Sequence, residues 1–548
     1  MSRIKIFSLG GLNEQGKNIY VVEVNQDIFV FDAGLKFSDD SMLGIDYVIP
    51  NYDYLKENEE RIKGIFLSHG HDEAMGAVPD MLVDLKKVNV YGTKFTLELL
   101  KSELEEEGLP TDQLIELKPH KKVEFGENSI FPISMTHSIP DSVGYVLYTK
   151  DGAIFYTGNF VFDPTMNDFY RMDIGKLAYV GKQGVLCLLS ESLYADRKGF
   201  TSPNHRIYSV MNEVFEKHDG RILCNVFASQ IYRIQEVLNA VTNNDRKIVI
   251  IGKRLEKIIQ KSIDMNYIHF DKKRICNLHH VEDEGIILLI ADDREKAFTN
   301  ISRIVKGYDK FVKLTEDDTV VFASQVYEGM IKTATKLFDL IARMGCELIT
   351  LPTKKYLNHH ASREDLMMMI DLMDPKYYMP VMGEYRHQVE NAKAAKLAGM
   401  KEENILLKLN GEVVLFEDGV LKETEEKQKI DSILIDGLQV GDVGELVLRD
   451  REALSDNGVV IVCATLDKAT KKILAGPEIL TRGFIYVKEH TDIIEEAEKI
   501  SLEVIEQNTK ENYIEFNKVK NGIREKLGKY LYNQTECKPM ILVVVQEV

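Results

Sequence analysis

Short apolar runs that stop at polar residues are the feature that most constrains the fold of the first 180 residues. β-Branched and aromatic residues concentrate in runs such as Ile19–Val24, Ile28–Asp32, Ile62–Ser68, Gly144–Tyr148 and Ala153–Thr157. Runs of this length and composition predict buried strands. Polar residues at the ends of buried strands are where layered enzymes carry their reactive groups. We therefore expect a β-rich layered domain with a site at one sheet edge.

The pattern changes around residue 182, where helical periodicity begins to alternate with short strands. The helical patterns lie at Ile207–His218, Gln230–Asn243, Leu255–Met265, Glu295–Val305 and Tyr327–Met344. The strand patterns lie at Arg221–Phe227, Lys247–Ile251, Gly285–Ala291 and Thr319–Ser324. This alternation predicts a parallel α/β domain.

The end of the chain has a third pattern. A charge-rich stretch without apolar residues, Glu423–Lys429, predicts a linker. Beyond it, the last hundred residues predict a small α+β domain. Its strands are expected at Val459–Thr465, Gly483–Val487 and Met540–Gln546, and its helices at Asp492–Gln507 and Ile514–Leu531.

Composition limits the classes of function. The 548 residues carry 69 basic and 87 acidic side chains, a net charge of −18, which argues against a surface uniformly adapted to nucleic acid but leaves a local basic channel open. The six cysteines form no CxxC pair and are typical of reduced thiols. No apolar run approaches the roughly 20 residues of a membrane span, and the N-terminus has no signal-peptide pattern. We expect a cytoplasmic protein that does not enter a membrane.

The segment Ser68–Ala74, with the sequence SHGHDEA, is the strongest chemical motif. It directly follows the apolar run Ile62–Leu67. Two histidines two positions apart on a loop after a strand can present two imidazoles to one metal ion. The alternative is a polar loop in which His69 and His71 fall together by chance.

Further motifs occur in the order of a metallo-β-lactamase domain. They are Leu9-Gly10-Gly11, Phe31-Asp32-Ala33-Gly34, the HxH loop, Thr136-His137-Ser138 and Tyr156-Thr157-Gly158-Asn159-Phe160. Other segments are similar to RNase J sequences, namely Met42–Pro50, Tyr91–Lys94, Ser190–Ser192, Lys376–Arg386, Ile435–Gly444, Ala475–Glu478 and Thr481–Phe484. The chain resembles the RNase J family over essentially its whole length, and the resemblance is closest to the degenerate second RNase J paralogue of Firmicutes.

The resemblance implies an α/β fold class: a metallo-β-lactamase αββα sandwich with an inserted β-CASP α/β domain and a small α+β C-terminal domain. It places the sandwich at residues 1–190 and 356–422 and the β-CASP domain at 191–355. A linker at 423–450 and an oligomerisation domain at 451–548 follow. Family members are 5′→3′ exoribonucleases and endoribonucleases that carry RNA to a two-zinc centre.

The sequence departs from the family at several metal-ligand positions. His69, His71 and His137 are retained. Glu73 replaces an aspartate and could reach a metal only with altered geometry, and Asn159 replaces the bridging aspartate with a neutral amide. Ala74 and Met382 stand where histidine ligands are lost. The family's two-zinc centre is not expected; we expect no metal or a single weakly bound zinc or manganese ion.

The inserted domain departs from the family as well. Glu191 and His360 match its catalytic positions, with Glu73 as a further catalytic candidate. The family's phosphate-gripping HxSGH stretch reads YLNHH at residues 356–360, so that only His360 is in register. The candidate RNA and phosphate contacts are Ser229, Asn358, His359, His360 and Ser362. The acidic segment Ala291–Glu295 lies where family members carry a glycine-rich loop, and its acids would repel a phosphate.

Three functional hypotheses follow. The first is a catalytically impaired or inactive subunit of RNA degradation and processing that pairs with an active RNase J paralogue, with a homodimer as another possible assembly. The second is a weak nuclease with one metal at His69, His71, His137 and Glu73. The third is a scaffold that does not bind RNA, which the acidic composition and the altered phosphate loop leave open. Whether the chain is itself an enzyme stays undecided at this point.

Overall fold

The computed structural model describes residues 2–38, 42–166, 168–292, 298–324, 326, 330–353, 355–437, 439–440, 445–485, 490–509 and 514–548. The chain divides into two compact units. The first comprises Met1–Phe37 and Asp46–Ile433, and the second comprises Ser38–Ile45 and Leu434–Val548. The two fragments of the second unit are therefore far apart in the sequence.

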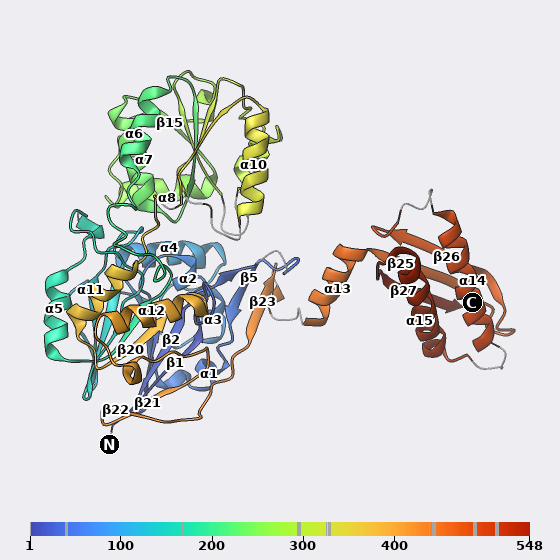
Figure 1. The fold of residues 1–548 in the computed structure, drawn as a ribbon, viewed down its shortest axis with the longest axis horizontal. Helices are drawn as coiled ribbons and strands as arrows, with labels where there is room; N and C mark the ends of the chain where they lie inside the picture. Colours follow the sequence, from blue (N-terminus) through green and yellow to red (C-terminus); the bar gives the residue numbers. More distant parts are fainter. Residues whose placement is uncertain are drawn as a thin grey trace. The chain divides into compact units, whose positions relative to one another are not determined.

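Two stacked sheets form the base of the first unit (Figure 1). One has the strand order β22-β21-β1-β2-β3-β6-β7-β8, and the other has the order β20-β13-β12-β11-β10-β9. The strands of the first sheet are β1 (Arg3–Gly10), β2 (Ile19–Val24), β3 (Asp27–Phe31), β6 (Ile62–Phe66), β7 (Val90–Gly92), β8 (Leu114–Glu116), β21 (Val414–Glu417) and β22 (Val420–Lys422). Those of the second are β9 (Val123–Phe125), β10 (Asn128–Ser134), β11 (Val143–Thr149), β12 (Gly152–Tyr156), β13 (Val185–Glu191) and β20 (Tyr377–Val381).

An aromatic core lies between these sheets because alternate residues of each strand point inward. Phe31 of the first sheet contacts Tyr145 and Tyr156 of the second, with ring centroids 6.0 and 5.8 Å apart. Burial of a single such ring stabilises the fold by about 1.5–3 kcal/mol. The core therefore holds together strands whose polar ends carry the candidate site.

Helices cover the outer faces and complete the αββα sandwich. Leu177, Val180 and Met369 from helices α5 and α11 pack against the second sheet. On the first sheet, Phe7 contacts Tyr54 of α1. The helices of the sandwich are α1 (Asp53–Glu57), α2 (Asp72–Met75), α3 (Val78–Asp84), α4 (Lys94–Glu106), α5 (Ile174–Gln183), α11 (Arg363–Met373) and α12 (Tyr385–Leu397).

The inserted part of the first unit is a six-stranded sheet of order β16-β15-β17-β14-β18-β19 whose pairs are all parallel. Helices α6 to α8 share one core with it, and α9 and α10 share a second core on the other face (Figure 1). The strands are β14 (Ile222–Phe227), β15 (Ile248–Ile251), β16 (Ile275–Cys276), β17 (Ile287–Asp292), β18 (Thr319–Phe322) and β19 (Glu347–Thr350). The helices are α6 (Tyr208–Lys217), α7 (Ile231–Asn243), α8 (Lys253–Asp264), α9 (Thr299–Val305) and α10 (Ile331–Arg343).

The parallel α/β prediction is thus confirmed. The predicted helix starts at Glu295 and Tyr327 lie outside the described residues, as do residues 293–295 of the acidic segment. The predicted boundaries at residues 190, 355, 422 and 450 stay predictions.

The insertion starts and ends on neighbouring strands of the sandwich. Strand β13 pairs with β20 in parallel, and Glu191 at the end of β13 lies opposite Val381. The chain leaves the sandwich after Glu191 and returns to the same sheet at β20. Residues on either side of the insertion are therefore held at one sheet edge.

The second unit contains a three-stranded sheet of order β26-β25-β27 with a core against two helices. Its main elements are α13 (Glu445–Asn457), β25 (Val459–Leu466), β26 (Ile473–Arg482), α14 (Thr491–Asn508), α15 (Phe516–Thr535) and β27 (Met540–Glu547). Short strands elsewhere in the chain are β4 (Lys36–Phe37), β5 (Tyr47–Pro50), β23 (Ser432–Asp436) and β24 (Gln439–Val440). The helices among the described residues include none that is long and apolar enough to cross a membrane.

One strand prediction in this unit was wrong. A strand was expected at Gly483–Val487, but β26 ends at Arg482, and residues 486–489 lie outside the described part of the chain. The strand runs instead through Gly476 and Pro477, two residue types that are depleted in strands and conceal the pattern. Its register against β25 shifts between Cys463 and Leu466, which accommodates these residues.

Candidate metal centre

The candidate site lies at the ends of strands of the sandwich. His69 and His71 follow β6, His137 follows β10, and Glu191 ends β13. His360 lies just before α11. Residues from four separate segments, which follow strands of both sheets or precede α11, are thus collected at one end of the sandwich.

Asp32 fixes the start of the HxH loop. Its carboxylate accepts hydrogen bonds from the Ser68 amide at 2.7 Å and from the Ser68 hydroxyl at 2.8 Å, and it also accepts one from the Tyr156 hydroxyl. Burial raises the pKa of Asp32 to about 7, although these hydrogen bonds oppose the shift. A Cβ at Gly34 would lie 1.7 Å from the carbonyl oxygen of Glu73, so only glycine permits this close approach of the two segments.

The three retained histidines form a compact group. The ring centroids of His69, His71 and His137 lie 4.7 to 4.9 Å apart, and all three rings are buried. One nitrogen from each ring lies within 4.8 Å of the other two. This spacing suits three imidazoles around a single ion.

The outer nitrogen of each ring is held by an oxygen. His71 Nε2 donates to the Ser229 carbonyl at 3.0 Å, and His137 Nδ1 donates to the His359 carbonyl at 2.7 Å, because carbonyls can only accept. His69 Nδ1 lies 2.8 Å from the Ser68 hydroxyl, which already donates to Asp32 and therefore accepts here. The inner nitrogens thus keep their lone pairs directed at a common point, the arrangement that outer partners impose on metal-bound histidines.

The inner nitrogen of His71, Nδ1, lies close to two other polar atoms of the site. His137 Nε2 lies 3.3 Å from His71 Nδ1, and Glu73 Oε1 lies 3.2 Å from the same nitrogen. Burial opposes charge on His71, but Glu73 raises the pKa of its imidazole. Burial lowers the pKa of His69 to about 4 and holds the pKa of His137 well below its usual value. Two of the histidines are therefore neutral at pH 7, as metal ligands must be.

Glu73 lies beside the histidines and keeps 34% of its side chain exposed. Its Oε1 atom is 3.7 Å from His69 Nε2. Burial would raise the pKa of the Glu73 carboxyl, but the facing histidines lower it well below its ordinary value. The carboxylate is thus placed where it neutralises a proton on His71 or a cation among the rings.

The substituted positions offer no comparable donors. Ala74 presents a buried methyl group, and Met382 packs in the core between the sheets. Asn159 is buried with neither side-chain polar atom hydrogen-bonded to a described residue. The donor set among the described residues fits one ion at the three histidines and does not fit the family's two-metal centre.

Glu191 and His360 are brought together on the side of the inserted domain. His360 Nδ1 lies 2.9 Å from Glu191 Oε2, and its ring centroid lies 5.5 Å from that of His137. The other carboxylate oxygen of Glu191 accepts the amides of Phe160 at 2.7 Å and Ala361 at 3.2 Å. Glu191 therefore orients His360 toward the histidine group.

The remaining phosphate candidates have varied surroundings. Asn358 is buried and accepts a hydrogen bond from Gln230 at 3.0 Å, and His359 is buried with neither ring nitrogen hydrogen-bonded to a described residue. Ser362 is the N-cap of α11, and its hydroxyl lies 2.7 Å from that of Thr201. Ser229 contacts the histidine group through its backbone carbonyl. Their roles toward RNA stay predictions.

A buried polar group behind His359 was missed from the sequence. The ring of His205 lies 4.5 Å from that of His359, and His205 Nε2 lies 3.0 Å from Asp163 Oδ2. Arg233, fully buried, donates to the carbonyl oxygen of Leu357. The signal was present in α7, where Arg233 and Glu236 are charged residues among the otherwise apolar buried positions of the helix.

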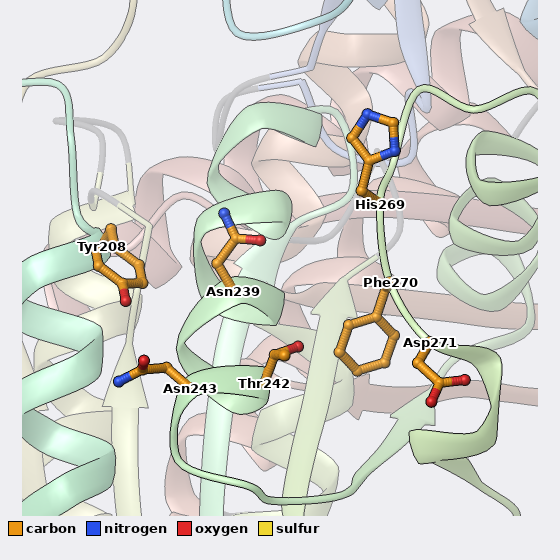
Figure 2. A pocket seen from close by; sticks show the side chains of 7 residues that line it. All are labelled: Tyr208, Asn239, Thr242, Asn243, His269, Phe270 and Asp271. Atoms are coloured by element: carbon orange, nitrogen blue, oxygen red, sulfur yellow. The ribbon is translucent and has the colours of Figure 1, made fainter.

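A separate polar cavity of about 370 Å³ lies in the inserted domain, bordered by helices α6 and α7 and the segment that follows α8 (Figure 2). Its lining residues are Tyr208, Asn239, Thr242, Asn243, His269, Phe270 and Asp271. None of the predicted site residues lines it, so it is distinct from the histidine group.

Four protein families match successive parts of the chain. Residues 29–174 match a beta-lactamase superfamily domain, and residues 219–341 match the ribonuclease J beta-CASP domain. Residues 354–407 match a Zn-dependent metallo-hydrolase RNA specificity domain, and residues 446–548 match the ribonuclease J C-terminal domain. Their order reproduces the predicted architecture of a sandwich, an inserted domain and a C-terminal domain.

Known proteins agree with this assignment. Ribonuclease J2 of Bacillus subtilis (strain 168) is 40% identical, covering 100% of this chain and 99% of that protein. Ribonuclease J 2 of Staphylococcus aureus (strain MRSA252) is 36% identical, covering 100% and 98%. A crystal structure of a protein of unknown function from Enterococcus faecalis V583 shares the fold alone, with a TM-score of 0.52, 14% identity and coverage of 76% of this chain and 100% of that one. With full-length relatives at this level of identity and four matching domains in family order, the chain belongs to the RNase J family.

Proposed function

We propose that this protein is an RNase J-type subunit of RNA degradation and processing whose own nuclease activity is weak or absent. The observation that carries the proposal is the contrast between three well-held histidines and the donor-poor positions Ala74, Asn159 and Met382. The relatives named ribonuclease J2 and ribonuclease J 2 support the same assignment.

The chemistry explains why these substitutions would impair catalysis. A two-metal site neutralises both the attacking and the leaving oxygen of a phosphodiester. His69, His71 and His137 would hold one ion, which could supply a polarised water. Without a carboxylate at position 159, little would attract a second dication beside it. The chain would therefore lack half of the charge stabilisation on which the two-metal reaction depends.

The Glu191–His360 pair supports a continuing relation to RNA. Its 2.9 Å contact holds an imidazole toward the histidine group from the inserted domain. With Nδ1–H directed at Glu191, the Nε2 of an imidazole so placed can donate a hydrogen bond to a phosphate oxygen, without any metal, when the ring is protonated at both nitrogens. We therefore assign Glu191 and His360 to phosphate positioning, with Asn358, His359, Ser362 and Ser229 as neighbouring contacts.

The proposed partner is an active RNase J paralogue, with which the chain would form a hetero-oligomer in the cytoplasm. The matched ribonuclease J C-terminal domain at residues 446–548 is the segment we assign to assembly. A homodimer is the alternative assembly.

The first experiment is metal content by elemental mass spectrometry, before and after incubation with zinc or manganese. Less than about 0.1 ion per chain, with no uptake, supports an inactive subunit, and about one ion per chain supports a single weak site. Two ions per chain would contradict the proposal. Co-purification with the active paralogue from the same cells tests the pairing separately.

A second function, a slow one-metal nuclease, is favoured by the buried trio of His69, His71 and His137. Cleavage of 5′-monophosphorylated RNA that disappears in the His69→Ala/His71→Ala variant would support it. The same cleavage in this double variant would identify a contaminating nuclease. A scaffold that does not bind RNA would be recognised by the absence of RNA binding both alone and with the partner.

A further inference from the structure

The loop between α9 and β18 exposes two aromatic rings within four residues. Tyr308 is 74% exposed and Phe311 is 58% exposed. Large aromatic side chains normally bury most of their surface, and exposed ones gathered at one place mark binding surfaces. We call the segment Lys306–Lys313 the aromatic loop.

The aromatic loop is held in a defined conformation. Asp309 is buried, and its carboxylate accepts the amides of Phe311 at 2.8 Å and Val312 at 3.0 Å. It also accepts a hydrogen bond from Arg303 of α9 at 3.0 Å. Val312 packs into the core of the inserted domain. The two rings are thus presented outward on a fixed turn, which lowers the entropy lost when a ligand binds them.

Three lysines lie in the same loop as the rings. Lys306, Lys310 and Lys313 are exposed, and none has an ion pair among the described residues. The nearest basic neighbour, Arg303, is in contrast paired with Asp309 at 2.8 Å. On a chain with a net charge of −18, the aromatic loop itself carries three lysines against one acidic residue, Asp309.

The aromatic loop lies away from the histidine group. The Lys313 carbonyl accepts a hydrogen bond from Arg221 at 2.6 Å, and Arg221 immediately precedes β14. Ser229, which contacts His71, follows the other end of β14. A six-residue strand separates the two ends by roughly 20 Å. The loop is therefore a surface separate from the candidate metal centre.

We propose that the aromatic loop is a docking site for single-stranded RNA outside the candidate metal centre. Bases stack on Tyr308 and Phe311 while phosphates contact the three lysines. Rings interspersed with cations match the alternation of base and phosphate along a single strand. A protein interface instead concentrates its aromatic residues in an uncharged centre. This inference goes beyond the proposed function, because the loop can hold RNA whether or not the histidines hold a metal.

The test is fluorescence anisotropy of a labelled 16-nucleotide single-stranded RNA titrated with the full-length chain. The Tyr308→Leu/Phe311→Leu variant keeps apolar side chains but removes the stacking faces, so its affinity should fall about tenfold or more. The matched control is Tyr179→Leu, which removes a 56% exposed tyrosine from α5 and should leave the affinity unchanged. Equal affinity of the loop variant and the unaltered chain would overturn the proposal.

A charge variant provides an independent measurement. Lys306→Gln/Lys310→Gln/Lys313→Gln should lower the slope of log affinity against log salt by about 2, since each phosphate contact on a single strand contributes roughly 0.7. An unchanged slope would also overturn the proposal. A variant of the aromatic loop that no longer associates with the paralogue but keeps its RNA affinity would overturn it as well, because the loop would then be a protein-binding surface. If the unaltered chain binds no RNA, the proposed RNA-docking site is contradicted. The paired-subunit proposal is tested separately, by metal content and by co-purification.

Discussion

The two halves of the candidate centre share a backbone frame but differ in what fills it. In the histidine half, His69, His71 and His137 each have an outer nitrogen held by a fixed oxygen. In the substituted half, which we define as Ala74, Asn159 and Met382, the side chains are a methyl group, a buried amide without hydrogen bonds to described residues, and a core thioether. Only the histidine half therefore has side chains that are oriented as metal ligands.

The backbone is closely packed in both halves. A Cβ at Gly158 would lie 3.0 Å from that of Ser68, so the segment that carries Asn159 still packs closely on the HxH loop. Met382 adopts a φ of 62°, a left-handed conformation that few side chains favour, and its amide donates to the Tyr20 hydroxyl at 3.2 Å. Backbone geometry and ligand chemistry are thus separable: the first follows from packing, the second from individual side chains.

The largest effect is expected from the His69→Ala/His137→Ala variant. It should abolish zinc uptake, because one imidazole cannot hold the ion alone. Equilibrium dialysis followed by elemental analysis measures this. His280→Ala is the control, since that exposed residue pairs with Asp283 and not with the site. Uptake that persists in the double variant would place the metal elsewhere.

Rebuilding the substituted half should add a second ion. In the Ala74→His/Asn159→Asp/Met382→His variant, we expect zinc binding to rise toward two ions per chain and RNA cleavage to appear. Histidine tolerates the left-handed backbone at 382 better than most residues. Asn159→Asp alone is the control: it buries a carboxylate without its cation and should lower the melting temperature. No additional ion in the triple variant would mean that the frame has also changed.

A smaller effect should follow from Ser68→Ala. This change removes the oxygen that holds His69 Nδ1 while leaving all three ligands present. Loss of such an outer partner typically weakens metal binding by about 10–100-fold. Competition against a zinc indicator dye would measure the change. Ser142→Ala, at a buried serine that donates to the Ile139 carbonyl, is the control. Equal affinity of the Ser68 variant would show that packing alone orients the ring.

The smallest effect is a change in the pH dependence of stability through Asp32. Its folded-state pKa of about 7 lies above the usual carboxyl value, so the folded state binds the extra proton. Stability from this group is present at low pH and falls as pH rises toward 7, by up to about 2 kcal/mol between pH 5 and 7. In metal-free protein, Asp32→Asn should flatten the slope of melting temperature over this range. A slope equal to that of the unaltered chain would contradict the raised pKa.

Much of the fold was predictable because strands such as β2 and β20 bury both faces and therefore appear in the sequence as continuous apolar runs. The histidine half was equally accessible, since His69 and His71 lie in one local motif. Strand β26 was hidden by Gly476 and Pro477, whose local preferences oppose a conformation that pairing with β25 imposes.

Contacts across the insertion could not be predicted from local patterns. The Ser229 carbonyl meets His71 over 158 residues of sequence, and the His359 carbonyl meets His137 over 222. Both acceptors are backbone carbonyls, which every residue type provides, so the identity of the residue does not indicate the contact. The buried pair of His205 and Asp163 also depends on long-range packing, because each residue alone resembles an ordinary surface polar group.

The pairing of β1 with β21 has a consequence for biosynthesis. Arg3 lies opposite Glu417, and the amide of Ser2 donates to Asp418 across 416 residues of chain. At translation rates of roughly 5–20 residues per second, the nascent first strand waits about 20–80 s before this neighbour leaves the ribosome. During that interval one edge of β1 can pair with any other extended chain nearby. Nascent chains halted before residue 414 should therefore aggregate or recruit chaperones, whereas chains released after β21 should not.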